Sequence, residues 1–257
     1  DVFRALKGGE PERFPHRERS SKGGEPWHRA DKSGSVRAAV FGVSDGLVSN
    51  TALVMGFAGA SLAGAIENYV VLFAGLAGLL AGAFSMAAGE YVSMASQRDL
   101  FKREIDLERQ ELLEKPEEER LELELIYRAK GLPRDQARAV ADQIMKDPEI
   151  ALDTLAREEL GLDPDELGSA WKAAVSSFLS FAIGASVVVV PYALFTGMTA
   201  FVLAVVLAIV SLIVVGGLVG SQSGRGIVFS AGRQVLWGVG AAGVTYLVGS
   251  LVGVNVG

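Results

Sequence analysis

Four long stretches of this 257-residue chain contain no charged side chain, and this feature limits the possible folds more than any other. A helix needs about 20 apolar residues to cross the hydrocarbon core of a bilayer, and each stretch is longer than that. The four uncharged stretches are 68–89, 173–195, 198–220 and 234–257, and a fifth, 38–66, carries only Asp45. We therefore expect an all-α membrane protein with five transmembrane helices, which excludes a soluble enzyme, a nucleic-acid binder and a disulfide scaffold.

The charged residues are concentrated in one polar insert. Residues 97–166 hold 21 of the 30 acidic residues and 12 of the 24 basic residues. Glycine and proline in the first 35 residues favour a flexible tail. The predicted order is a tail at 1–35, transmembrane helices 1 and 2 at 36–97, a helical insert at 98–168, and transmembrane helices 3 to 5 at 169–257.

Three pairs of glycines at four-residue spacing predict where the membrane helices touch, because small residues let two helices approach closely. The pairs are Gly78/Gly82, Gly216/Gly220 and Gly249/Gly253.

The distribution of lysine and arginine predicts the orientation, because these residues are retained on the cytoplasmic side. Basic residues flank the start of helix 1, both ends of the insert and the link between helices 4 and 5. The other two links and the C-terminal end have none. We expect the N-terminus and the insert to be cytoplasmic and the C-terminus to be outside, in the inner or plasma membrane if the chain is prokaryotic.

Asp45 is the one charged residue of the stretch 38–66, and an ionisable group inside a membrane is a functional candidate. It lies about nine residues into that helix, ~14 Å deep by the helical rise and close to the midplane. Its neighbours are small or polar, which favours a hydrated pocket. The alternative is that residues 44–46 form a turn before the helix begins.

Glu90 lies late in helix 2, with Met86 and Met94 one turn away on the same face. The chain has no cysteine, so a metal would be held mostly by oxygen or thioether ligands. A carboxylate between thioethers suits Fe²⁺ better than Mg²⁺ or Ca²⁺. The alternatives are methionines that only pack and an interfacial Glu90 that extends toward water.

Two pairs of carboxylates flank Pro116 in the insert. They are Glu108/Glu111 and Glu119/Glu122, with Glu104 nearby. If the proline lets the two helices fold back on each other, the pairs converge into a cluster able to hold several divalent ions. The alternative is a solvated acidic face.

Three segments resemble the vacuolar iron transporter (VIT) family, in the form of a prokaryotic-type member. They are FGVSDGLVSN at 41–50, SMAAGEYVS at 85–93 and ELGL at 159–162. The resemblance covers about 36–257. It implies a homodimer in the lipid bilayer, with no enzymatic activity, that exports Fe²⁺ and often Mn²⁺ from the cytoplasm in exchange for protons. Co²⁺ and Zn²⁺ are further ions to test.

The resemblance also assigns residues. Asp45 and Met86 match the family's intramembrane ligands, and Glu159 matches a late acidic ligand of its metal-binding domain. The other carboxylates of that domain match Glu108, Glu111, Glu119 and Glu122. The chain departs from plant members at Gly78, where they carry a glutamate, and at Leu155, where they carry a methionine. The candidate set is Asp45, Met86 and Glu90 in the membrane, and Glu104, Glu108, Glu111, Glu119, Glu122 and Glu159 in the insert.

In the expected mechanism, the insert captures Fe²⁺ and passes it to a site where metal and protons compete for Asp45. Two other functions stay open. One is a membrane-anchored iron buffer or sensor, which would have no use for a carboxylate inside the membrane. The other is a ferroxidase completed by a ferritin-like domain upstream of Asp1.

Overall fold

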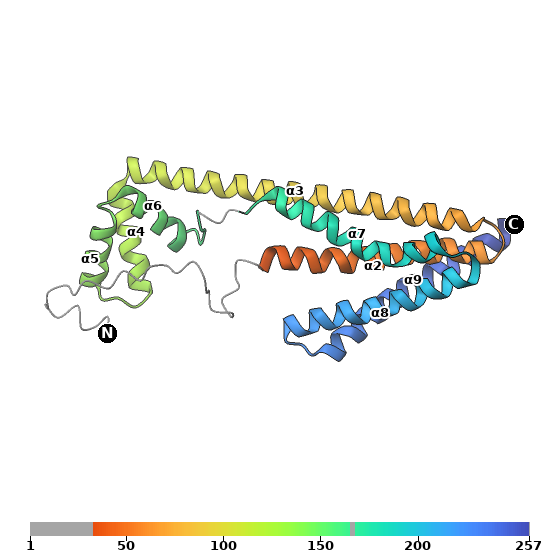
Figure 1. Ribbon diagram of the computed structural model, residues 1–257. Coiled ribbons are helices and arrows are strands. Elements are labelled where there is room, and N and C mark those ends of the chain that lie inside the picture. Colours follow the sequence, from red (N-terminus) through yellow and green to blue (C-terminus); the bar gives the residue numbers. More distant parts are fainter. Residues whose placement is uncertain (1–32, 165–167, 257) are drawn as a thin grey trace. The chain divides into compact units, whose positions relative to one another are not determined.

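The computed structural model describes residues 33–164 and 168–256, so almost all of the predicted tail lies outside the described residues. The elements in these ranges are all α-helices, as the sequence predicts (Figure 1). They are α2 (Ser33–Leu62), α3 (Asn68–Glu114), α4 (Pro116–Ala129), α5 (Arg134–Ile144), α6 (Pro148–Glu158), α7 (Ala170–Leu194), α8 (Gly197–Ser223) and α9 (Ile227–Val256).

Five of these helices are long and apolar enough to cross a membrane, which confirms the predicted number of spans. They are α2 from Ala39 to Leu62, α3, α7, α8 from Gly197 to Ser221 and α9 from Ile227 to Asn255. The remaining helices, α4 to α6, belong to the polar insert.

Helix α2 makes contacts with each of the other four spans. The amide of Asn50 donates hydrogen bonds to backbone carbonyls of α3 and α7. Val54 belongs to an apolar cluster that includes alanines of α8. On α9, the hydroxyl of Thr245 donates to the carbonyl of Ala52 at 2.6 Å. The helix that carries Asp45 is therefore joined to the other spans by both polar and apolar contacts.

The three glycine pairs lie at helix contacts, as predicted. A side chain at Gly78 or Gly82 would collide with residues of α2 and α7. A Cβ atom at Gly216 would lie 2.7 Å from the backbone of α9, and one at Gly253 would lie 3.1 Å from the Cα atom of Ala60 in α2. These glycines allow backbone approaches that any larger residue would prevent.

Helix α3 is unbroken for 47 residues, across the predicted boundary between helix 2 and the insert. No glycine or proline occurs between Glu90 and Lys115, so nothing in the sequence kinks the helix there. Two aromatic pairs lie at different positions along α3. Tyr69 packs on Phe73, and Tyr91 packs on Trp171 of α7. Tyr69 and Tyr91 are ~33 Å apart by the helical rise, which matches the distance between the aromatic belts of a membrane. The rest of α3 extends beyond the membrane into the insert.

The insert turns back at Lys115, and Pro116 starts α4 at a position where a missing N–H costs nothing. Asp147 caps α6, as its carboxylate accepts from the amides of Glu149 at 3.0 Å and Ile150 at 3.4 Å. Two small apolar clusters hold the insert together. One joins Leu123, Ala141 and Leu155, and the other joins Ile105, Leu152 and Ala156.

Candidate metal centre

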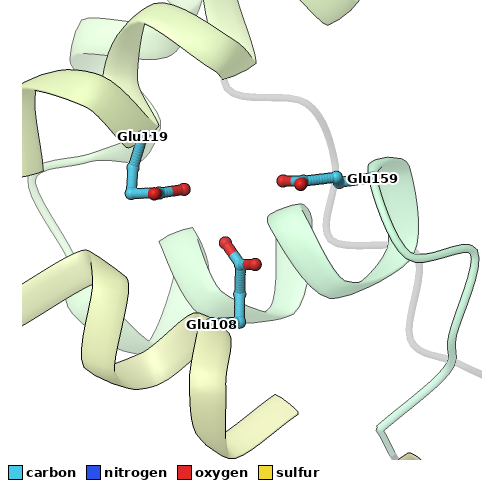
Figure 2. A group of neighbouring side chains, drawn as sticks. All are labelled: Glu108, Glu119 and Glu159. Carbon is cyan, nitrogen blue, oxygen red and sulfur yellow. The ribbon is translucent and has the colours of Figure 1, made fainter. Parts of the chain in front are cut away.

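Three carboxylates of the insert point toward one another. One oxygen atom each from Glu108, Glu119 and Glu159 lies within 4.8 Å of the other two. Figure 2 shows the side chains converging from three directions. Glu108 lies on α3, Glu119 lies on α4, and Glu159 is the residue that follows α6. Three oxygen ligands around a common point form a set that a divalent cation can use.

Two structural features bring these residues together. The turn at Pro116 folds α4 back on α3, which brings Glu108 near Glu119. The packing of Leu152 and Ala156 on Ile105 then lays α6 against α3. An ion pair between Lys130 and Glu158 fixes the end of α6 to the end of α4, one residue before Glu159.

Burial makes this group of carboxylates electrostatically unfavourable without a cation. The side chains of Glu108 and Glu119 are only 2% and 5% exposed. An oxygen of each has no hydrogen-bond partner. None of the ion pairs in the described part of the chain involves Glu108, Glu119 or Glu159. A bound divalent cation would supply the missing positive charge.

The pKa values follow from this environment. Burial, followed by the charges of Glu159 and Glu119, raises the pKa of Glu108 to about 8. Burial also raises the pKa of Glu119, to which the carboxylates of Glu122 and Glu111 add, whereas the hydrogen bond with Glu108 lowers it. The pKa of Glu159 is raised by burial and then by Glu122, Glu119 and Glu111. Metal binding near neutral pH would therefore displace protons from the group.

The remaining predicted carboxylates of the insert lie around this group. Glu111 and Glu122 are exposed, yet close enough to raise the pKa values of their buried neighbours. Glu104 is half-buried and lies one turn before Glu108 on α3, outside the group of three. Leu155, where plant members of the resembled family carry a methionine, is fully buried in the apolar core of the insert.

A third buried carboxylate of the insert, Glu124, was not predicted from the sequence. Its side chain is 4% exposed and lies 3.6 Å from Arg120 and 3.5 Å from Arg134. Arg120 also binds Asp142 of α5 at 3.1 Å. This network joins α4 to α5 and balances the buried charge with arginine. The only sequence signal was an arginine one turn before Glu124.

In the membrane region, Asp45 is exposed on the surface of the single chain. Residues 44–46 are helical, so the alternative of a turn there is wrong. The apolar part of α2 begins at Ala39. Asp45 is therefore ~9 Å inside that end by the helical rise, nearer the surface than the predicted midplane, because α2 continues to Leu62.

Met86 lies about one helical turn from the part of α3 that faces Asp45. Met86 packs against an apolar cluster that contains Phe181 of α7. The backbone of Phe181 lies against Gly46, and its ring lies against Gly82, one turn before Met86. Gly46 of α2 and Gly82 of α3 therefore lie at the same height along the helix bundle. Glu90, half-buried, lies one turn further along α3, beside the aromatic pair of Tyr91 with Trp171, whose ring centres are 4.9 Å apart.

The raised pKa of Glu108 predicts how the stability of the metal-free insert depends on pH. Below its ordinary value of 4.5, Glu108 is protonated in both the folded and the unfolded chain, and stability is highest. Between 4.5 and about 8 the unfolded chain releases a proton that the folded chain keeps, so stability falls as pH rises. Amide hydrogen exchange in α4 and α6, corrected for intrinsic rates, should show protection falling over this range.

Saturating Fe²⁺ under anaerobic conditions should remove that loss of protection, because the metal favours the ionised carboxylates. Protection that increases with pH in the metal-free protein would contradict this account of the group.

Comparison with known proteins gives consistent matches. A sequence model of the VIT family matches residues 36–250. Vacuolar iron transporter 1 of Oryza sativa subsp. japonica is 34% identical over 212 residues, or 82% of each protein. Vacuolar iron transporter 1 of Arabidopsis thaliana is 31% identical over 218 residues, which is 84% of this chain and 86% of that protein. The vacuolar iron transporter of Acanthamoeba castellanii is 40% identical over 150 residues, 58% of this chain and 52% of that protein. The range matched by the family model includes all nine candidate residues.

Proposed function

Because this chain belongs to the VIT family, we propose that it exports Fe²⁺ from the cytoplasm in exchange for protons, with Mn²⁺ as a second substrate. The protein is a membrane transporter and not an enzyme. The observation that carries the proposal is the group of Glu108, Glu119 and Glu159, in which Glu108 and Glu119 each hold a buried oxygen with no hydrogen-bond partner. In this scheme the insert captures the metal, and Asp45 and Met86 hold it in the membrane.

The proposed orientation places the N-terminus and the insert in the cytoplasm and the C-terminus outside. It rests on the basic residues that flank only one side of the five spans. With this orientation the group of carboxylates meets cytoplasmic metal first. For a prokaryotic cell the membrane would be the plasma membrane.

We also propose that two copies of the chain form the transport path. Asp45 is exposed on the single chain at a depth where lipid would surround it. A carboxylate facing hydrocarbon is costly, and such residues face a partner or a hydrated cavity. A second copy packed on this face of α2 would place two Asp45 side chains along one path.

Helix α3 offers a route between the insert and the membrane. Ligand-type and partly buried side chains follow one another along it at spacings of three or four, which places them on one face. In order they are Met86, Glu90, Met94, Gln97, Phe101, Glu104 and Glu108. Of these seven, Gln97 is the exposed one. Glu104 and Glu90 would be the intermediate carboxylates for a cation that leaves Glu108.

Proton exchange follows if Fe²⁺ and protons compete for the carboxylate of Asp45. A carboxylate that binds a divalent cation must release its proton, and a proton arriving from the other side promotes release of the metal. No ATP is needed when the two ions share Asp45.

The test is uptake of Fe²⁺ by proteoliposomes that hold the full chain, under anaerobic conditions. An acidic interior should accelerate Fe²⁺ entry, and entry should raise the internal pH reported by a trapped dye. Empty liposomes are the control. Fe²⁺ entry that ignores the pH gradient would contradict antiport, and absence of entry with normal metal binding would favour the buffer or sensor.

A further inference from the structure

Asn50 is a buried amide in the middle of α2. Its side chain is 2% exposed, and it is the twelfth of the 24 residues between Ala39 and Leu62. Its Nδ2 group donates to the carbonyl of Gly75 on α3 at 3.2 Å and to the carbonyl of Ala185 on α7 at 3.0 Å. Since both partners only accept, the orientation of the amide is determined. One side chain therefore ties three helices together.

The other end of this amide has no hydrogen-bond partner. Asn50 Oδ1 is buried and unpaired, and a Cβ atom at Gly78 of α3 would lie 2.6 Å from it. The absence of a side chain at Gly78 allows α3 to approach the amide this closely. An unpaired acceptor in an apolar interior is unfavourable, so stability alone is a poor reason for an asparagine here. A buried asparagine between helices is well suited to fixing their register.

The three helices that Asn50 joins are also the helices that carry Asp45, Met86 and Phe181. Asp45 precedes Asn50 on α2 by five residues. Phe181, which contacts both Gly46 and Gly82, precedes Ala185 on α7 by one turn. The hydrogen bonds of Asn50 thus lie about one helical turn from Phe181.

We propose that Asn50 is a positioning residue for metal passage, which fixes the register of α3 and α7 against α2 and so sets how Asp45 and Met86 face a cation. A slip of one residue along a helix moves a side chain by ~1.5 Å and turns it by ~100°. Metal ligands must be held to within ~0.5 Å, so a slip of that size would remove Met86 from the site. The inference rests on the proposed function, because it concerns the geometry of the transported ion.

The experiment compares Asn50→Leu, which keeps the size but loses both donors, with Thr51→Val as the matched control. Thr51 is also buried, at 4% exposure, but its hydroxyl donates to Leu47 in its own helix. The chain contains no cysteine, so spin labels can be attached at cysteines introduced at Phe57 on α2 and Leu80 on α3, which are both exposed.

For Asn50→Leu we expect a broader distribution of label distances and a KM for Fe²⁺ uptake raised about tenfold, a loss of ~1.4 kcal/mol. The maximal rate should change less, and Fe²⁺ binding by the insert should stay unchanged. Thr51→Val should match the wild type in all of these. A merely structural role would lower the amount of folded protein without raising KM.

Two results would overturn the inference: a wild-type distance distribution in Asn50→Leu, or a wild-type KM. If Asn50→Leu does not accumulate in membranes, Asn50→Asp, which keeps Oδ1 and the shape but replaces Nδ2, is judged by the same two measurements. Failure of the wild-type protein to move Fe²⁺ would instead overturn the proposed function, and the label distances would still decide whether Asn50 fixes the register.

Discussion

Replacing Asp45 with alanine should reduce the initial rate of Fe²⁺ uptake into proteoliposomes by about 100-fold or more. Loss of a residue that only supports a metal ligand costs 10- to 100-fold, and Asp45 is proposed to be a ligand itself. It is also the one charged side chain between Ala39 and Leu62, so that helix holds no second carboxylate to take over. Fe²⁺ binding by the insert, measured by calorimetry on the same preparation, should stay unchanged.

The matched control is Glu67→Ala. Glu67 is an exposed acidic residue in the link between α2 and α3, so its loss changes the charge equally without touching the predicted path. Uptake by Asp45→Ala at near the wild-type rate would refute the role of Asp45 as a ligand.

The second large effect concerns the insert. The triple variant E108Q/E119Q/E159Q should weaken Fe²⁺ binding by the insert about 100-fold or more, because amides keep the size of the side chains but remove the negative charge that holds a cation. Uptake should fall at low Fe²⁺ concentration and recover as the concentration is raised. Without metal, the variant should keep its hydrogen-exchange protection at pH 8, since the raised pKa of Glu108 no longer destabilises the fold.

The control for this variant is E114Q/E117Q/E118Q, which removes the same number of charges from exposed positions around the same turn. If this control loses as much affinity, the insert acts through its general negative charge, and Glu108, Glu119 and Glu159 do not form a specific site.

Much of the fold could be predicted from the sequence because membrane spans and helix caps are local signals. The uncharged stretches determined the five spans, and Asp147 followed by Pro148 marked the start of α6. The continuity of α3 was harder to predict. Its composition changes from apolar to charged near Gln97, which resembles a domain boundary, yet backbone hydrogen bonding in a helix does not depend on that change.

The site was only partly predictable, because helical spacing gives the face of a residue but not what covers it. Glu108 and Glu111 share one spacing pattern, but Glu108 is buried near Glu119 and Glu159 whereas Glu111 is exposed. Glu159 is distant in sequence, and only the family resemblance pointed to it. Asp45 and its small or polar neighbours were expected to form a hydrated pocket, whereas the structure turns the nearby Asn50 to the interior and Asp45 to the surface. The rotation of α2 about its own axis depends on its contacts with the other four spans, which the sequence does not reveal.

The unbroken course of α3 has a mechanical consequence. Met86 and Glu108 belong to one helix and are separated by ~33 Å of it. Because no glycine or proline interrupts α3 between Glu90 and Glu114, a rotation of α3 near Pro116 would be transmitted along the helix toward Met86. Any movement of the insert on binding a cation would then also change the orientation of the Met86 side chain.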